Sequence, residues 1–186
     1  MSCHGDFYLD ESIRRKWYNP ESILKDAGLK ANMVFMDIGC GDGFFSMLAS
    51  EIVGSSGLIY ALDIDTSAIE RLKHQATDLG LTNIKATAGS AEETVFCSRC
   101  ADVIFFSMVL HDFSNPEKVL LNSKKMLKNT GVLVNLDWKK KRMLLGPPMH
   151  VRFSENKAAE LLKQAGFNVK GIKEAGPHHY IVTAKP

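Results

Sequence analysis

The stretch VFMDIGCGDGFFS, residues 34–46, decides the fold of this 186-residue chain. An apolar run ends at an acid, Asp37, and glycines follow at alternate positions, Gly39, Gly41 and Gly43, before a helical pattern begins. Glycines at such a bend permit backbone angles that a Cβ atom forbids, and they allow a ligand to lie against the main chain. The stretch therefore predicts a strand that turns sharply into a helix beside a bound ligand.

The spacing of these glycines separates two kinds of cofactor site. A dinucleotide fingerprint, G-x-G-x-x-G, requires a third glycine at position 44, where this chain has Phe44. The observed G-x-G-x-G, with Asp37 two residues before it, resembles motif I of the class I S-adenosylmethionine (SAM) methyltransferases. The resemblance implies that Asp37 orders the ammonium group of SAM. It also implies that the amino-acid half of SAM lies on Gly39, Cys40, Gly41 and Gly43. The alternative is an ordinary glycine-rich turn.

Composition and length are those of an ordinary globular protein. Charged residues make up 24% of the chain, hydrophobic residues 45%, and the net charge is +2. We expect one domain over residues 1–186, with a lid or capping segment (1–30), a cofactor-binding core (31–137) and a substrate side (138–186). The chain starts without an apolar signal region and has no apolar run near 18 residues. We therefore expect a cytoplasmic protein without a membrane partner.

Strands and helical patterns alternate along the rest of the chain. Further strands are expected at residues 58–62, 84–88, 101–108, 132–136, 167–173 and 180–184. Helices are expected from Asn19-Pro20, after a capping box of Ser67 and Glu70, from Asn115-Pro116 to about Lys128, and over 155–164. The last two strands are joined by a short turn, so they should pair antiparallel. The prediction is a Rossmann-like, doubly wound α/β fold: a seven-stranded, mostly parallel sheet with one antiparallel strand and helices on both faces.

Residues that directly follow the strands are the candidate site residues, because ligands of an open parallel sheet bind at the carboxyl ends of its strands. Asp63 follows the second strand, with Ile64 beside it, and its carboxylate can accept both hydroxyls of a ribose. In the family that the chain resembles, an Asp often stands at position 90 and binds the adenine amino group. This chain departs from that pattern, so the candidates there are Ser90, Ala91 and Glu92. The fourth strand runs out into Ser107, which completes the cofactor-binding set.

Acid–base candidates come from two rims of the sheet. His111 beside Asp112 follows the fourth strand, and an imidazole next to a carboxylate is suited to proton transfer near neutral pH. The alternative is a loop that only contacts the methionine tail of SAM. The last turn adds His178 and Tyr180 as catalytic candidates. The fourth-strand region lacks the [DN]-P-P-[YF] signature of amino-methylating nucleic-acid enzymes, so a nucleic-acid substrate is not expected.

Substrate contacts are expected from four further residues, Trp17, His150, Arg152 and His179. Arg152 either anchors an anionic group through its planar guanidinium or forms a salt bridge within its loop. The basic runs at 14–16 and 139–142 are either solvated faces or signs of an anionic substrate. The leader with Phe7, Tyr8, Trp17 and Tyr18 forms either a lid or a cover for a sheet edge. The chain as a whole resembles the small-molecule, UbiE-type branch of the family, and the segments RRKWYNPE, GPPMHVR and GPHHY resemble small single-domain methyltransferases with no settled substrate.

Cys97 and Cys100 form a lone C-x-x-C, and structural disulfides are uncommon in a reducing compartment. No metal site is expected, although delivery of a metalloid substrate by these thiols is an alternative. A catechol-type metal site at Asp112 and Asp137 is disfavoured because the neighbouring Trp138 cannot bind a metal. The sequence thus predicts in-line methyl transfer from SAM to a small-molecule acceptor, with S-adenosylhomocysteine as product and the oligomeric state open. The alternatives are a nicotinamide-dependent oxidoreductase and a non-catalytic SAM-binding protein.

Overall fold

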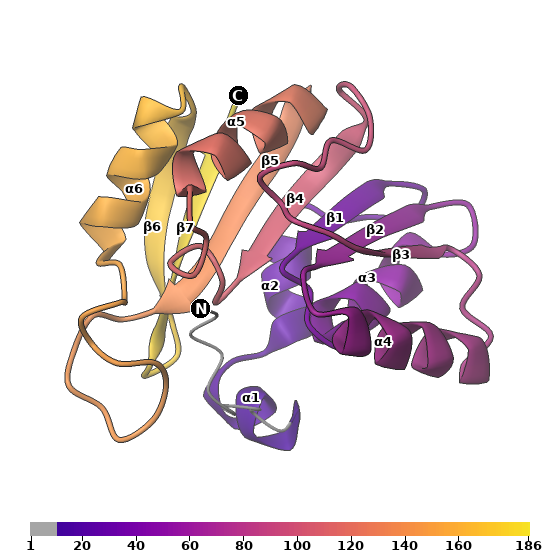
Figure 1. The fold of residues 1–186 in the computed structure, drawn as a ribbon, viewed down its shortest axis with the longest axis horizontal. Helices are drawn as coiled ribbons and strands as arrows, with labels where there is room; N and C mark the ends of the chain where they lie inside the picture. The colour runs from indigo at the N-terminus through magenta and orange to yellow at the C-terminus, as the bar shows by residue number, and fades with distance from the viewer. Residues whose placement is uncertain (1–10) are drawn as a thin grey trace.

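A seven-stranded sheet forms the centre of the computed structural model, which describes residues 11–186 (Figure 1). Its strands are β1 (Val34–Ile38), β2 (Leu58–Asp63), β3 (Ile84–Ala88), β4 (Ala101–Ser107), β5 (Leu127–Trp138), β6 (Asn168–Ala175) and β7 (His179–Lys185). They lie in the order β3-β2-β1-β4-β5-β7-β6. Neighbouring strands are parallel except that β7 runs antiparallel to both β5 and β6. The predicted fold class is confirmed.

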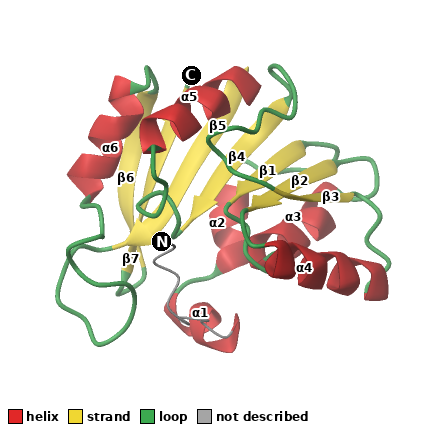
Figure 2. Cartoon of the chain, viewed as in Figure 1, coloured by secondary structure: helices red, strands yellow, loops and turns green. Residues whose placement is uncertain are grey.

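Helices cover both faces of the sheet (Figure 2). The helices are α1 (Glu11–Trp17), α2 (Pro20–Asp26), α3 (Phe44–Val53), α4 (Thr66–Asp78), α5 (Pro116–Met126) and α6 (Glu155–Gln164). Neighbouring strand residues point to opposite faces, so Phe105 packs in the core with α2 and α3, whereas Phe106 packs in the core with α5 and α6. Among residues 11–186, no helix is both long and apolar enough to cross a bilayer. Phe7 and Tyr8 of the expected lid lie outside the described residues.

Several element boundaries differ from the predicted ones. Helix α5 ends at Met126 and β5 begins at Leu127, because Leu127 already pairs with Ala101 and an irregularity in the β4–β5 register absorbs the residues that follow. The predicted capping box at Ser67 is wrong. Asp65 caps α4 instead, since its Oδ1 accepts from the backbone N–H groups of Ser67 (2.8 Å) and Ala68 (3.3 Å). Helix α1 was not predicted at all.

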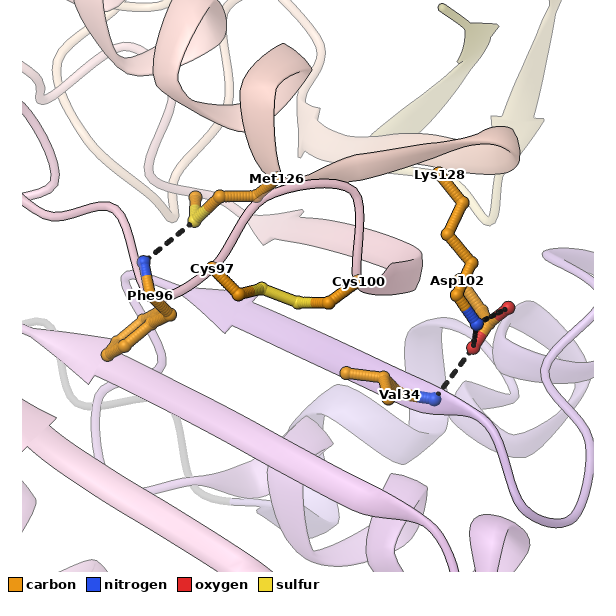
Figure 3. Close-up of a disulfide and its surroundings, with 7 residues drawn as sticks. All are labelled: Val34, Phe96, Cys97, Cys100, Asp102, Met126 and Lys128. Atoms are coloured by element: carbon orange, nitrogen blue, oxygen red, sulfur yellow. Dashed lines mark hydrogen bonds and ion pairs between the residues drawn. A yellow bond between two sulfur atoms is a disulfide. The ribbon is translucent and has the colours of Figure 1, made fainter.

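A loop without a helix connects β3 to β4, which breaks the expected alternation of strands and helices. Phe96 of this loop packs on the sheet, where its ring stacks on Tyr60 with the ring centroids 4.8 Å apart. The backbone N–H of Phe96 also donates to Sδ of Met126 (Figure 3). A disulfide joins Cys97 and Cys100 in this loop, contrary to the expectation from the sequence. In this form neither sulfur is free to bind a metalloid.

Candidate active site

The glycine loop lies at the carboxyl end of β1 and is held to the end of β2. The backbone N–H groups of Gly39 and Cys40 both donate to the carbonyl of Leu62, at 2.7 and 3.0 Å. Gly39 has a φ of +73°, and a Cβ atom there would lie 2.5 Å from Cγ2 of Val109. At Gly41, a Cβ atom would point into open space. The loop therefore packs tightly against the β4 side of the site and leaves its second glycine open to a ligand.

A cavity of about 350 Å³ opens beside this loop, within the size range of cofactor sites. Residues from the ends of β1, β2, β3 and β4 line it. They are Gly39, Leu62, Asp63, Ile64, Gly89, Ser90, Ala91, Glu92, Val109, Asp112, Phe113 and Ser114. The remaining cofactor candidates do not line it and lie in the glycine loop or at the strand ends: Asp37, Cys40, Gly41, Gly43 and Ser107.

Two carboxylates support the glycine-loop end of the site. Asp63 accepts from the N–H of Gly41 (2.7 Å) through Oδ2 and from that of Asp65 (2.9 Å) through Oδ1, and it still lines the cavity. Asp37 is buried, with Oδ2 accepting from the hydroxyl of Ser46 (2.6 Å). Its Oδ1 has no hydrogen-bond partner in the described part of the chain. Burial, with a smaller contribution from the charge of Asp63, raises the pKa of Asp37 to about 7.

The part of the cavity wall that follows β3 carries Ser90 and Glu92. The Ser90 hydroxyl donates to Oε2 of Glu92 (2.6 Å), and the N–H of Asn115 donates to Oε1 (3.3 Å). Burial alone would raise the pKa of Glu92, but these donors outweigh burial and lower it. Glu92 is therefore an ionised acceptor in the cavity wall. The side chain of Ile64 is 70% exposed beside it and provides an apolar surface for a flat ring.

His111 pairs with Asp137, not only with its sequence neighbour. Nδ1 of His111 lies 2.8 Å from Oδ1 of Asp137, and its Nε2 lies 3.7 Å from Oδ1 of Asp112. The first contact is an ion pair rather than an aligned hydrogen bond, because the ring N–H does not point along the line to the oxygen. Burial opposes the charged ring, but Asp137 and then Asp112 outweigh burial and raise the pKa of His111 above its ordinary value. The pair meets the cavity through Asp112.

A second buried polar group lies beneath α1, on the other face of β5 and β7. His179 is fully buried between Trp138 (ring centroids 4.3 Å apart), Tyr18 (5.3 Å) and Trp17 (5.6 Å). Neither ring nitrogen of His179, nor the hydroxyls of Tyr18 and Ser107, has a hydrogen-bond partner within residues 11–186. Burial lowers the pKa of His179 to about 3 and raises that of Tyr18 to about 12. All of these groups are therefore neutral at physiological pH.

Arg152 is buried in the loop between β5 and α6, where its guanidinium binds the loop's own backbone. It donates to the carbonyls of Pro147 (2.7 Å), Leu145 (2.9 Å), Lys141 (3.2 Å) and Lys139 (3.3 Å). It also lies 5.5 Å from the ring centre of Trp138. Its partner within the loop is thus the backbone rather than an acidic side chain. This placement gives no support to Arg152 as an anchor for an anionic substrate.

The other candidates are scattered. Tyr180 is buried in the α5–α6 core, where its hydroxyl donates to the carbonyl of Phe153 (3.3 Å) and burial raises its pKa. His178 is partly exposed in the hairpin turn, 5.0 Å from the ring of Trp17. His150 is exposed in the β5–α6 loop and does not line the cavity. The structure therefore brings together only His111 and Asp112 of the four catalytic candidates.

Several residues of the site escaped the sequence reasoning. Val109 and Phe113 line the cavity, and Met108 before them adopts a left-handed backbone with φ of +56°. Such a conformation is costly for a residue with a side chain and is typical of functional sites. Asp137 was considered only as a metal ligand. The rule that residues after strands form the site would have selected Asp137, since it directly follows the strand predicted at residues 132–136.

A parallel sheet with such a cavity at its carboxyl edge is the architecture of a nucleotide-type cofactor enzyme. A family model described as "Methyltransferase domain" matches residues 29–175, so the chain belongs to the methyltransferase domain family. The ubiquinone/menaquinone biosynthesis C-methyltransferase UbiE of Haemophilus ducreyi (strain 35000HP / ATCC 700724) is 29% identical over 133 residues, which cover 71% of this chain and 51% of that protein. The chain spans about half the length of this curated relative.

Solved structures agree with this assignment. A SAM dependent methyltransferase from Aquifex aeolicus is 31% identical, with a TM-score of 0.89 over 94% of this chain and 93% of that chain. The [4+2]-cyclase SpnF has a TM-score of 0.80 at 13% identity, over 99% of this chain and 86% of that chain. The second likeness concerns the fold alone. The predicted resemblance to class I SAM methyltransferases is thereby confirmed, with SAM as cofactor and S-adenosylhomocysteine as product.

The residues present fit this cofactor. The unpartnered buried Oδ1 of Asp37 is an acceptor suited to an ammonium group, and the open space at Gly41 can receive the amino-acid half. Asp63 and Glu92 both place carboxylates in the wall of the cavity, and the exposed side chain of Ile64 would be covered by a bound nucleoside. Cys40, in contrast, is a buried thiol whose pKa is raised by burial, so it contributes packing and backbone rather than reactivity.

Proposed function

We propose that this protein transfers the methyl group of SAM to a small-molecule acceptor. One observation carries this proposal: Asp112 lines the cavity and also contacts His111, which is paired with the buried Asp137. SAM supplies a methyl group already activated on a sulfonium. The residues of the chain therefore have to position the acceptor in line, exclude water and remove a proton from an acceptor that carries one.

Each end of the cofactor has its residues in this proposal. Asp37 accepts hydrogen bonds from the ammonium group through Oδ1. Asp63 accepts hydrogen bonds from the ribose hydroxyls, and Glu92 accepts one from the adenine amino group. The backbone N–H of Ala91 and the hydroxyl of Ser90 adjoin the adenine. The remaining candidates form the floor under the cofactor: Gly39, Cys40, Gly41, Gly43, Ile64 and Ser107.

His111 is the base of the proposed reaction. Its Nε2 lies 3.7 Å from Oδ1 of Asp112, a residue that lines the cavity, and its Nδ1 lies 2.8 Å from Oδ1 of Asp137. In the neutral ring, the proton stays on Nδ1, the nitrogen that lies 2.8 Å from Asp137, so Nε2 is free to accept the proton of the acceptor. Asp137 then stabilises the imidazolium that forms. Asp137 acts through His111 and is a positioning residue.

The acceptor is proposed to be a ring compound with an ionisable hydroxyl group. Trp17, at the end of α1, forms an aromatic wall with Trp138 and His179, beside the carboxyl end of β5 and the start of β7. The Haemophilus ducreyi relative is named as a C-methyltransferase of ubiquinone and menaquinone biosynthesis. His178 at the rim belongs to this wall, while Tyr180 and Arg152 support it from behind. Within the same proposal, residues 1–30, 31–137 and 138–186 serve as lid, cofactor core and acceptor side of one cytoplasmic domain.

Calorimetry tests the cofactor. We expect SAM and S-adenosylhomocysteine to bind and NAD(H) not to bind. Asp63→Asn should weaken SAM binding roughly tenfold, because it removes a charged acceptor from the cavity. Asp42→Asn is the matched control: it removes the same charge from the neighbouring glycine loop, but Asp42 pairs with Arg71 (2.7 Å) and does not line the cavity. Binding of NAD(H) without SAM would overturn the assignment.

Transfer is measured with methyl-labelled SAM and a panel of hydroxylated ring compounds, each paired with the same ring without its hydroxyl. We expect label only in the hydroxylated members. Label in the rings without hydroxyl would contradict the role of His111. If SAM binds but no compound is labelled, the acceptor class is wrong and a SAM-binding protein without activity becomes the better description.

A further inference from the structure

The loop between β5 and α6 exposes apolar side chains next to positive charges. We call residues 140–149, KKRMLLGPPM, the cationic–apolar loop. It projects from the carboxyl edge of the sheet, drawn in orange at the lower left of Figure 1. Leu144 is fully exposed, and Leu145 and Met149 are 41% and 45% exposed. Three cations precede them in the chain and are exposed as well: Lys140, Lys141 and Arg142.

Hydrogen bonds to Arg152 fix the backbone conformation of the cationic–apolar loop. Arg152 lies buried under it and donates to the carbonyls of Lys139, Lys141, Leu145 and Pro147. Four carbonyls bound to one guanidinium fix the path of the loop, so its leucines cannot fold back into the core without breaking these bonds. The outward direction of the apolar side chains is therefore built into the fold.

The positive charges of the loop are not used inside the protein. Lys139 turns inward and pairs with Glu174 (2.8 Å), but Lys140, Lys141 and Arg142 form no ion pair with any residue of the described chain. Other exposed apolar residues, such as Leu79, Leu121 and Ile172, lie on separate elements. Within residues 11–186, this loop combines three cations without an ion pair and three exposed apolar side chains in a single stretch of the chain. Such a combination matches a surface that is anionic outside and apolar underneath.

A lipid surface fits this loop better than a protein partner. A stable protein interface covers roughly 800 Å² on each side and needs complementary shape. One projecting loop tip offers neither. A lipid headgroup layer adapts to any tip shape, attracts cations and receives apolar side chains a short distance below.

We propose that the cationic–apolar loop docks the protein on an anionic lipid surface. Leu144, Leu145 and Met149 insert at the boundary of the acyl chains, and the three cations contact the headgroup phosphates. From the sequence we expected no membrane partner, because no segment could span a bilayer; a surface loop requires no span. The docked protein turns the carboxyl edge of its sheet, with the cofactor cavity, toward the lipid. This inference does not depend on the proposed methyl transfer.

Vesicle flotation tests the proposal with the full chain. We expect binding to vesicles of phosphatidylglycerol and phosphatidylcholine in equal parts, weakening with salt, and no binding to phosphatidylcholine alone. The triple variant Lys140→Gln, Lys141→Gln, Arg142→Gln should weaken binding about 100-fold. The double variant Leu144→Ser, Leu145→Ser should weaken it about tenfold or more while keeping its salt dependence.

The matched control is Lys163→Gln, Lys170→Gln, Lys185→Gln, which removes the same charge from exposed lysines at the opposite edge of the sheet. It should change vesicle binding less than about twofold, and calorimetry with SAM checks that every variant is folded. An equal loss in the control would assign the binding to general charge and overturn the proposal. So would absence of binding to anionic vesicles. In that case, an oligomer in sedimentation that the leucine variant dissociates would assign the surface to a second copy of the chain.

Discussion

Three residues, Asp37, His111 and Asp137, carry ionisable groups that are almost completely removed from water. A buried charge is unfavourable unless an opposite charge or a donor compensates it. His111 and Asp137 compensate each other. Asp37 has only the hydroxyl of Ser46 on one oxygen, so a ligand ammonium is the partner that would complete it. The affinity and chemistry of the site are therefore expected to depend on pH in two separable ways.

The affinity for SAM should rise with pH. Burial raises the pKa of Asp37 to about 7, so ligand-free protein binds a proton there that the cofactor's ammonium must displace. We expect the association constant to increase roughly tenfold from about pH 6 to about pH 7.5, measured by calorimetry. The same shift means that ligand-free protein loses stability as pH rises from about 4 through about 7. Asp37→Asn should bind more weakly with a flat profile, and a flat profile in the unaltered protein would contradict this account.

The rate of transfer should rise with pH through the pKa of His111, because only the neutral ring is a base. Asp137 raises that pKa, so Asp137→Asn should move the rising limb of the kcat profile to lower pH and also lower its plateau. His111→Gln should remove the limb and reduce kcat by about 100-fold or more. Neither change should alter the affinity for SAM. An unshifted limb in Asp137→Asn would show that Asp137 serves packing only.

At the scale of secondary-structure elements, the loops and turns that connect helices and strands form most of the cavity wall. The cavity is built from the turns that follow β1, β2, β3 and β4, and α1 closes against the hairpin between β6 and β7. The fit at the hairpin is close, since a Cβ atom on Gly176 would meet the backbone carbonyl of Trp17. Rigid strands thus fix the positions from which variable connections present their side chains.

The variant Arg152→Lys tests how much the loop between β5 and α6 contributes to the stability of the protein. Lysine keeps the charge but cannot bind four carbonyls at once, so some of them stay buried without a donor. We expect the free energy of unfolding to fall by about 2 kcal/mol in denaturant titration and hydrogen exchange to increase in residues 139–151. SAM affinity should stay within about twofold, because this loop does not line the cavity. Weaker SAM binding with unchanged exchange would place Arg152 in the cofactor site after all.

For the molecule as a whole, the cofactor site joins separate parts of the sheet. Gly39, Asp63, Glu92 and Asp112 come from four connections, so a ligand that contacts them all is bound only by the folded chain. The cofactor should accordingly stabilise the entire domain. The acid–base pair and the cationic–apolar loop belong to the other half of the sheet, which follows β4 and β5.

Thermal unfolding measures this coupling. S-adenosylhomocysteine at a hundred times its Kd should contribute about 2.7 kcal/mol and raise the Tm by about 5–10 °C for a chain of this size. NADH should leave the Tm unchanged. At the same concentration, Asp63→Asn should show a smaller shift and Asp42→Asn the full shift. An equal shift in both variants would mean that Asp63 does not contact the cofactor.

Local patterns were enough to identify the fold and the cofactor. The spacing of Gly39, Gly41 and Gly43 is set by backbone angles within one turn, and strand β3 was predicted with its observed bounds. The strand-end rule then selected Asp63 and Glu92, both in the cavity wall. These features depend on neighbours in the chain, so the sequence alone determined them.

Only the tertiary structure determined which side chains contact each other. His111 was expected to use Asp112, but the pairing of β4 with β5 brings Asp137 to its other nitrogen. Arg152 was expected at a substrate or an acidic group, and the loop's carbonyls surround it instead. The start of β5 likewise depends on contacts between separate segments, since Leu127 pairs with Ala101. Such partners are set by strand order and register, which arise from hydrogen bonds and packing between distant parts of the chain and leave no local pattern to read.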